Sequence, residues 1–173
     1  GFFDVESVWP KLEQALRQAI SNLVAMRETE GSNIYGDFIK RADLIAEKLA
    51  VIEERSPQVV EEYQIRLSDR INELLAKHNQ VIEPERLLQE VAIFADRTSI
   101  TEEIVRLKSH IKQFRLIIDA DQPVGRKLDF LIQEFNREAN TIASKANDYT
   151  LAQVVVEIKA EIEKIREQIQ NIE

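Results

Sequence analysis

Apolar residues recur at steps of three and four along almost the whole chain, which is the spacing of helices that bury one face. In the first part of the chain one such row runs over residues 10–31 and a second over residues 32–56. Pro57 either opens a third helix or kinks one very long helix, and the row then continues to about Lys77. No alternating apolar and polar run typical of a strand occurs, so the sequence predicts an all-α protein.

Shorter helices are predicted in the second half of the chain. The first begins at Pro84 and ends between residues 96 and 98. Capping boxes, in which Ser or Thr is followed three residues later by Glu or Gln, predict that further helices begin at Ser99–Glu102 and Thr150–Gln153. Over residues 155–172 a seven-residue apolar repeat continues almost to the end, and this repeat requires a partner helix from the same chain or from another copy.

The segment GRKLDFLIQEFNREANTIASKAND, residues 125–148, has two opposed faces. Its apolar row predicts a buried face and consists of Leu128, Ile132, Phe135, Ala139, Ile142 and Ala146. The opposite row carries amides and hydroxyls in place of the usual Glu and Lys and consists of Arg126, Asp129, Gln133, Asn136 or Arg137, Asn140, Ser144 and Asn147. Asn, Ser and Asp are weak helix formers, so this row is either a polar packing seam or a functional site.

The composition agrees with a helical fold. Gly and Pro number four each, and aromatic residues make up 6% and charged residues 31% of the 173 residues, which is typical of long helices and coiled coils. We therefore expect an elongated all-α domain of about five to seven helices, including long antiparallel coiled-coil-like helices. Residues 1–82 are expected to form long helical rods, and residues 83–173 are expected to form a helical bundle that carries the site.

The absence of cysteine excludes a disulfide framework and a thiolate metal site, and it fits a reducing, cytoplasmic location. No apolar run approaches the roughly 20 residues that a membrane span needs. The chain begins at Gly1 without an initiator Met, which suggests a piece of a longer protein.

The charge balance restricts any nucleic-acid site to a local patch. The formal net charge of -8 argues against a general electrostatic grip on phosphates, which depends on Lys and Arg. The segment IVRLKSHIKQFR, however, contains no acidic residue and carries His110 among four cations, Arg106, Lys108, Lys112 and Arg115. This patch either binds phosphate or forms the outward face of a helix whose cations pair with nearby Glu.

A polar row on the same segment contains Glu103, Arg106, His110 and Gln113, which follow one another at steps of three, four and three. The histidine therefore lies with polar residues and outside the apolar row. In this position it fits a base or a metal ligand. A His-rich metal site is excluded, because the second histidine, His78, lies in an expected loop with no supporting pattern.

Paired carboxylates are a second candidate feature. Glu134 and Glu138 are four residues apart, and such a like-charge pair costs about 0.2–0.5 kcal/mol unless a positive group lies between them. A divalent cation such as Mg²⁺ or Mn²⁺ is one such group, since carboxylates without thiolates suit these metals. Arg137 or Lys145 is another, and needs no metal. Asp129 is either neutralised by a neighbouring arginine or a further ligand.

Several blocks of this sequence resemble the YicC family of bacterial proteins, which is also known from its YloC members. The most recognisable block is GRKLDFLIQEFNREANTIASKAND, and the others, in the family's order, are MRETEGS, ERLLQEVAIFADR, ITEEIVRLKSHIKQF and EKIREQIQNIE. The resemblance covers nearly all 173 residues. Phe135 and Ala143 stand where the family pattern has Met and Gly, and both departures are conservative.

The resemblance implies a part of a bacterial endoribonuclease. Family members carry an N-terminal domain that opens on a short Met-Thr-Gly-type motif, and nothing here resembles it, so this chain would be the C-terminal portion. The implied activity is divalent-metal-dependent hydrolysis of RNA phosphodiester bonds in RNA and small-RNA turnover. The implied assembly is a ring-like homo-oligomer, a hexamer, that encloses RNA and involves no membrane.

The resemblance also implies roles for individual residues. Glu134, Glu138 and Asp129 would hold or orient a Mg²⁺ or Mn²⁺ ion, and with His110 they make up the candidate catalytic set. The residues implied in RNA binding are Arg97, Arg106, Lys108, Lys112, Arg126, Lys127, Asn136, Arg137, Asn140, Ser144 and Lys145. The cations among them would contact phosphates, and the asparagines would position the substrate.

Three alternatives remain open at this stage. His110 could be a base that activates the RNA 2′-hydroxyl, with no essential metal. The chain could instead be a non-catalytic oligomerisation and RNA-clamping arm whose catalytic groups lie in the absent N-terminal domain. Outside the resemblance, it could be a structural coiled-coil adaptor that binds another protein.

Overall fold

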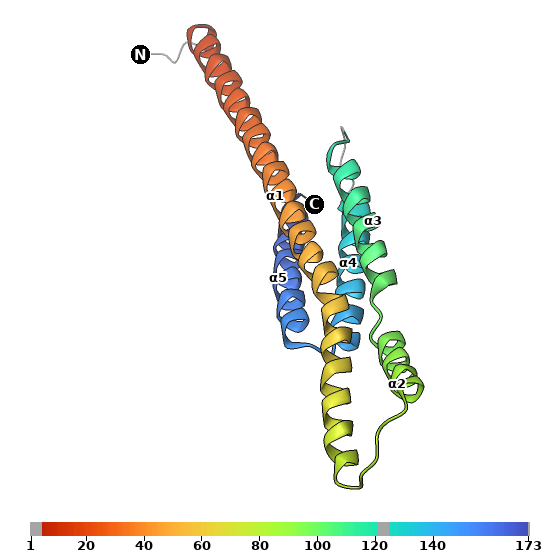
Figure 1. Cartoon of the computed structure of the whole chain (residues 1–173). Coiled ribbons are helices and arrows are strands. Elements are labelled where there is room, and N and C mark those ends of the chain that lie inside the picture. Colours follow the sequence, from red (N-terminus) through yellow and green to blue (C-terminus); the bar gives the residue numbers. More distant parts are fainter. Residues whose placement is uncertain (1–4, 121–124, 173) are drawn as a thin grey trace. The chain divides into compact units, whose positions relative to one another are not determined.

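The computed structural model describes residues 5–120 and 125–172, and within these ranges every regular element is an α-helix. The helices are α1 (Val5–Ala76), α2 (Pro84–Arg97), α3 (Thr101–Ile118), α4 (Gly125–Lys145) and α5 (Tyr149–Ile172), as Figure 1 shows. The predicted all-α class is confirmed. No helix in the described ranges combines the length and the apolar character that a bilayer crossing requires.

One helix replaces the separate helices expected before residue 77. Gly31 and Pro57 both lie inside α1. The expectation of five to seven helices therefore counted too many helices in this segment. Of the two interpretations of Pro57, the continuous helix is the one observed. Pro57 is exposed, so water can satisfy the carbonyl group that its missing N–H leaves free. Arg55 also links the two sides of the proline, because its guanidinium donates to Glu62 at 2.8 Å.

Both predicted capping boxes are wrong in detail. The N-cap of α3 is Ile100, one residue after Ser99, and it makes no side-chain capping hydrogen bond. α5 begins before Thr150, because the carboxylate of Asp148 accepts a hydrogen bond from the backbone N–H of Leu151 at 3.0 Å. An aspartate at this position satisfies a free N–H group of the first turn, which is the usual role of an N-cap residue.

The chain divides into two compact units, Gly1–Phe38 and Ile39–Glu173. In the first unit the predicted apolar row of α1 is present but exposed. Its exposed members are Leu12, Leu16, Leu23 and Met26, and Trp9, which precedes the row, is exposed as well. Among the described residues of this unit, no other segment packs over the row and buries it.

In the second unit, ion pairs define how α1 and α5 run against each other. Arg41 on α1 donates to Glu161 on α5 at 3.0 Å, and Arg55 donates to Asp148 at 2.9 Å. Advancing along α1 therefore means moving back along α5, so the two helices are antiparallel. α2 is attached to the same part of α1 by a stacked pair of rings, Tyr63 and Phe94, whose centroids are 3.7 Å apart.

α4 lies between α3 and α5 and packs against both (Figure 1). Its predicted apolar row supplies a large part of the core, and five of its members, Leu128, Ile132, Phe135, Ala139 and Ile142, are buried. The seven-residue repeat of α5 is buried in the same core through Val155, Ile158, Ile162, Ile165 and Ile169. The partner helix that this repeat requires is therefore α4 of the same chain. Since α4 also packs against α3, it is fixed on two sides.

Candidate functional site

Three potential metal ligands face one another between α3 and α4. His110 comes from α3, and Glu134 and Glu138 come from successive turns of α4. One ligand atom of each residue lies within 4.8 Å of those of the other two. Each of the three is followed in the sequence by a buried apolar residue, so core packing holds them at the edge of the helix interface. We refer to these three residues as the carboxylate–histidine cluster.

His110 has the least satisfied side chain of the cluster. Its Nε2 atom lies 3.9 Å from Glu134 Oε2, which is too far for a hydrogen bond. Both ring nitrogens are buried, and neither has a hydrogen-bond partner among the described residues. The ring lies beside that of Phe135, with 6.4 Å between centroids. Leaving a buried polar atom unpaired costs about 1–3 kcal/mol. Such an atom calls for an explanation, and binding of a ligand by the imidazole is one.

Arg106 supplies a fixed positive charge beside the cluster. Only 4% of the Glu138 side chain is exposed, and its Oε1 atom accepts a hydrogen bond from Arg106 Nε at 2.9 Å. This hydrogen bond raises the pKa of Arg106, and its effect exceeds the opposing effect of burial. The guanidinium therefore stays charged, and it compensates one of the two carboxylates of α4.

The ion-pair network continues from Arg106 to Glu103 and Lys145. The Glu103 side chain is 2% exposed, accepts a hydrogen bond from Lys145 Nζ at 2.7 Å and lies 3.6 Å from Arg106. Burial raises the pKa of Glu103. The hydrogen bond from Lys145 and the positive charges of Lys145 and Arg106 lower this pKa by more, so the net shift is downward. The predicted polar row of α3 thus faces α4 through Glu103, Arg106 and His110.

Asp129, the third metal ligand expected from the sequence, is not a member of this cluster. It precedes Glu134 by five residues, which at about 100° per residue places it on another side of α4. The structure therefore brings together three of the four expected catalytic residues, His110, Glu134 and Glu138. The pairing register of α3 and α4 determines which of the four meet.

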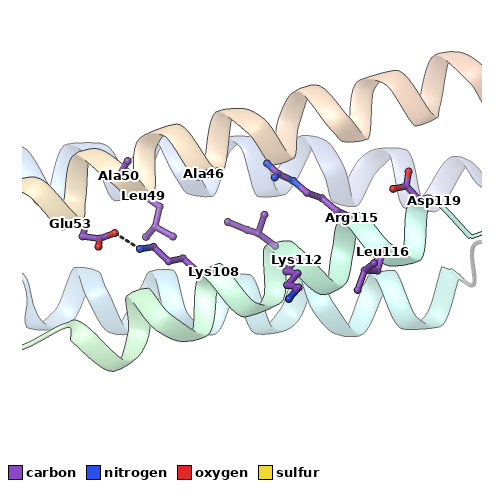
Figure 2. A pocket seen from close by; sticks show the side chains of 10 residues that line it. Ala46, Leu49, Ala50, Glu53, Lys108, Lys112, Arg115, Leu116 and Asp119 are labelled. Carbon is purple, nitrogen blue, oxygen red and sulfur yellow. Dashed lines mark ion pairs between the residues drawn. The ribbon is translucent and has the colours of Figure 1, made fainter.

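The predicted basic patch of α3 is divided between two faces. Lys108 pairs with Glu53, and Arg115 pairs with Asp43 at 2.9 Å, both on α1. Figure 2 shows these two cations in a groove between α1 and α3, which Lys112 also lines and which has a volume of about 410 Å³. Arg106, by contrast, faces α4 and pairs with Glu138. The three later cations are therefore turned away from the carboxylate–histidine cluster.

The other residues expected to bind RNA are distributed over α2 and α4. Arg137 is closest to the cluster, with its Nη1 atom 3.9 Å from Glu134 Oε2. Arg97, Ser144 and Lys145 line a second, more polar pocket of about 420 Å³ at the ends of α2 and α4. The remaining ones lie elsewhere on α4 and are Arg126, Lys127, Asn136 and Asn140.

Asp148 has a structural role that the sequence patterns did not reveal. Arg55 donates to its two carboxylate oxygens at 2.9 and 3.2 Å, in addition to the capping bond to α5. The hydrogen bond from Arg55 lowers the pKa of Asp148 by more than burial raises it. An acidic residue directly before a helix is a common N-cap, so the sequence did contain a signal for the capping role. No local pattern predicts the pairing with Arg55.

Comparisons with known proteins agree with the resemblance of the sequence blocks. Residues 52–173 match the family described as "Endoribonuclease YicC-like, C-terminal". "Probable endoribonuclease YicC" of Clostridioides difficile (strain 630) is 51% identical over 98% of this chain. A protein of the same name from Haemophilus influenzae (strain ATCC 51907 / DSM 11121 / KW20 / Rd) is 36% identical over 98% of the chain. The chain spans 58% of the length of each relative. The chain therefore belongs to the YicC-like endoribonuclease family and matches its C-terminal part.

Proposed function

We propose that the carboxylate–histidine cluster binds a divalent cation and that this chain takes part in the metal-dependent hydrolysis of RNA phosphodiester bonds. The observation that carries the proposal is the buried imidazole of His110, whose two nitrogens lack partners in the described chain and which faces two carboxylates. One imidazole and two carboxylates form a ligand set that suits Mn²⁺, and carboxylates alone suit Mg²⁺. The names of the relatives support RNA as the substrate.

The charge of the buried network favours such a cation. Arg106 pairs with Glu138 and Lys145 pairs with Glu103, whereas Glu134 has only the long contact of 3.9 Å to the exposed Arg137, so its carboxylate is the least compensated of the three when the histidine is neutral. A divalent cation would add positive charge beside this carboxylate and create a site for a phosphodiester. When bound, it would lower the pKa of a water ligand and offset the charge that develops on the attacked phosphate.

Arg137 is placed to contact the RNA backbone at this site. Its side chain is mostly exposed, and its only described ion pair is a long one, 3.9 Å, to Glu134. A weakly paired, exposed guanidinium can bind a phosphate bidentately without giving up a strong native interaction. Arg106, which is held by Glu138, is more suited to keeping that carboxylate oriented.

Cleavage of a labelled single-stranded RNA, with Mn²⁺ or with EDTA, tests this function. Glu134→Gln and Glu138→Gln each remove a ligand charge and should lower the cleavage rate by about 100-fold or more. Glu163→Gln is the matched control, because Glu163 is an exposed carboxylate of α5 that pairs with Arg166. Since the chain spans 58% of its relatives' length, the chain and the full-length protein are assayed side by side. Full activity in both cluster variants would clear the cluster of a catalytic role.

His110 also fits a second chemistry, in which an unpaired ring nitrogen removes the proton of an RNA 2′-hydroxyl. The same observation, two buried nitrogens without partners in the described residues, supports this alternative. The products distinguish the two mechanisms. Metal-dependent hydrolysis stops with EDTA and leaves 5′-phosphates, whereas attack by the 2′-hydroxyl resists EDTA and leaves 2′,3′-cyclic phosphates. The two carboxylates within 4.8 Å of the imidazole ligand atom favour the first.

We infer that the protein works as a ring-like homo-oligomer, as the family resemblance implies. The exposed apolar row of the first unit supports this assembly, because contact with a second copy would remove Leu12, Leu16 and Met26 from water. Light scattering after size exclusion measures the mass of the full-length protein. A monomer at micromolar concentration would contradict the ring.

The alternative to a catalytic role is a non-catalytic RNA-clamping arm. RNA binding without cleavage by the full-length protein would support that alternative.

A further inference from the structure

An exposed aromatic ring lies one helical turn before Glu134 of the carboxylate–histidine cluster. The side chain of Phe130 on α4 is 60% exposed, whereas Phe114 and Phe135 are fully buried. Phe130 precedes Glu134 by four residues, so the two lie on the same side of the helix. Arg126 precedes Phe130 by another four. This side of α4 therefore presents a cation, an aromatic ring and a carboxylate on successive turns.

Phe130 is mostly exposed and does not pair with another aromatic ring of the described residues. A single exposed apolar side chain needs no explanation by itself, but Phe130 lies one helical turn before Glu134, a member of the carboxylate–histidine cluster. In the described part of the second unit, the other exposed aromatic residue is Tyr149, which begins α5 and lies outside the cluster.

We propose that Phe130 is a stacking platform for an unpaired RNA base next to the bond that is cut, an inference that rests on the proposed function. Nucleobases stack on exposed aromatic side chains, and this contact tolerates any base because every base has a π-face. One helical turn is about 5.4 Å, which is within reach of the nucleotide whose phosphate lies at the cluster. Arg126, one turn further along, is then placed for the neighbouring phosphate.

This role requires an unpaired base. A base that is paired within a duplex is stacked on its neighbours and cannot offer its face to a side chain, whereas bases of single strands and loops can be splayed out.

Variants of Phe130 in the full-length protein test the proposal. Single-turnover cleavage of a single-stranded RNA with Mn²⁺, over a range of protein concentrations, gives the apparent Kd and the rate at saturation. Phe130→Ala and Phe130→Leu should both raise the apparent Kd by about tenfold, because the loss of one base stack corresponds to about 1–3 kcal/mol. Phe130→Trp should stay close to the wild type. Tyr149→Ala is the control and should leave the Kd unchanged.

A fluorescent base gives a readout specific to stacking. In an RNA with 2-aminopurine at the cleaved position, binding should quench the fluorescence with the wild type and Phe130→Trp and leave it largely unquenched with Phe130→Ala. Wild-type affinity in Phe130→Leu would overturn the proposal, because it would show a simple apolar contact. A lower oligomeric mass in Phe130→Ala would also overturn it, since the ring would then lie between copies.

The proposed function and the stacking proposal fail in different ways. If the wild type cleaves RNA with Mn²⁺ but Phe130→Ala binds and cleaves as well as the wild type, the stacking role alone is wrong. If the wild type does not cleave under any of these conditions, both proposals are wrong.

Discussion

His110 is the residue on which the candidate site depends, and it is held in an environment that is unfavourable for its own side chain. Both ring nitrogens are removed from water without replacement hydrogen bonds in the described chain. Functional sites commonly break the rules of stable packing in this way, because the ligand supplies the missing partner. Stability and ligand binding should therefore respond in opposite directions when this residue is changed.

The variant His110→Leu should be more stable than the wild type by about 1 kcal/mol in metal-free urea denaturation. Leucine carries no desolvated nitrogen and is a better helix former than histidine. The same variant should lose Mn²⁺ binding, measured by isothermal titration calorimetry. A clear loss of stability would show that the imidazole is satisfied in the native protein and would count against its role as a ligand.

Asp148 should contribute to stability through its capping bond and its pairing with Arg55. Asp148→Ala removes the N-cap of α5, and such a loss costs about 0.5–2 kcal/mol. Urea denaturation followed by circular dichroism measures the change. The control is Asp69→Ala, at an exposed position of α1. Equal effects of the two substitutions would mean that the contacts of Asp148 contribute nothing.

At the scale of the elements, the register between α3 and α4 creates the site. Glu103 meets Lys145 near one end of the pair, while His110 faces Glu134 further along, so the two helices are antiparallel. Shifting one helix by a single turn, about 5.4 Å, would separate each of these partners. The buried Glu103 is the residue that penalises such a shift, because a buried carboxylate without its cation is strongly unfavourable.

The pair of Glu103 and Lys145 should therefore be energetically coupled. Lys145→Ala leaves the buried carboxylate with only the longer contact to Arg106 and should cost about 1–3 kcal/mol. In a Glu103→Gln background the same substitution should cost much less, because no buried charge remains. A double-mutant cycle from urea denaturation gives the coupling energy. Additive effects, within about 0.5 kcal/mol, would contradict this account of the α3–α4 interface.

The sequence predicted the interiors of the helices well, because those depend on local periodicity. The buried row of α4 and the seven-residue repeat of α5 are both observed. Their partners could not be read locally, since a repeat shows that a helix needs a neighbour without showing which one. The polar row that includes His110 was likewise predicted, but its meeting with Glu134 and Glu138 depends on the α3–α4 register, which no local pattern encodes.

Helix ends and breaks were less predictable, because distant residues compete with local signals. Thr150 had the local pattern of a cap, but Asp148 takes that role and is held by Arg55, 93 residues earlier in the chain. The local pattern at Pro57 allowed either a helix boundary or one long helix, and α1 continues through it. At an exposed position, a proline inside a helix loses one backbone hydrogen bond to water, and the rest of the helix persists.

At the scale of the whole molecule, three carboxylates tie stability to pH. The pKa values of Glu62 and Asp148 are lowered by hydrogen bonds from Arg55, and that of Glu103 is lowered by its cations despite burial. Each carboxylate therefore binds a proton less readily in the folded state than in the unfolded chain. Their stabilising contribution is complete above the unfolded pKa values, near 4, and is lost as the pH falls through the lower folded values.

Thermal unfolding at a series of pH values checks this expectation. The unfolding temperature should fall as the pH drops from about 5 towards 2. In Arg55→Met, whose side chain cannot pair with Glu62 or Asp148, the protein should be less stable at pH 7 and should lose less on acidification. The same acid sensitivity in the variant and the wild type would show that this arginine does not set the pH dependence.

The central claim, that His110, Glu134 and Glu138 form a metal site, needs no RNA and no complete enzyme to be tested. Calorimetric titration of the chain with Mn²⁺ should show one saturable site per chain in the wild type. Glu134→Gln should weaken that site by at least about tenfold, and the control Glu163→Gln should leave it unchanged. No saturable binding by the wild type, or equal affinity in Glu134→Gln, would contradict the account.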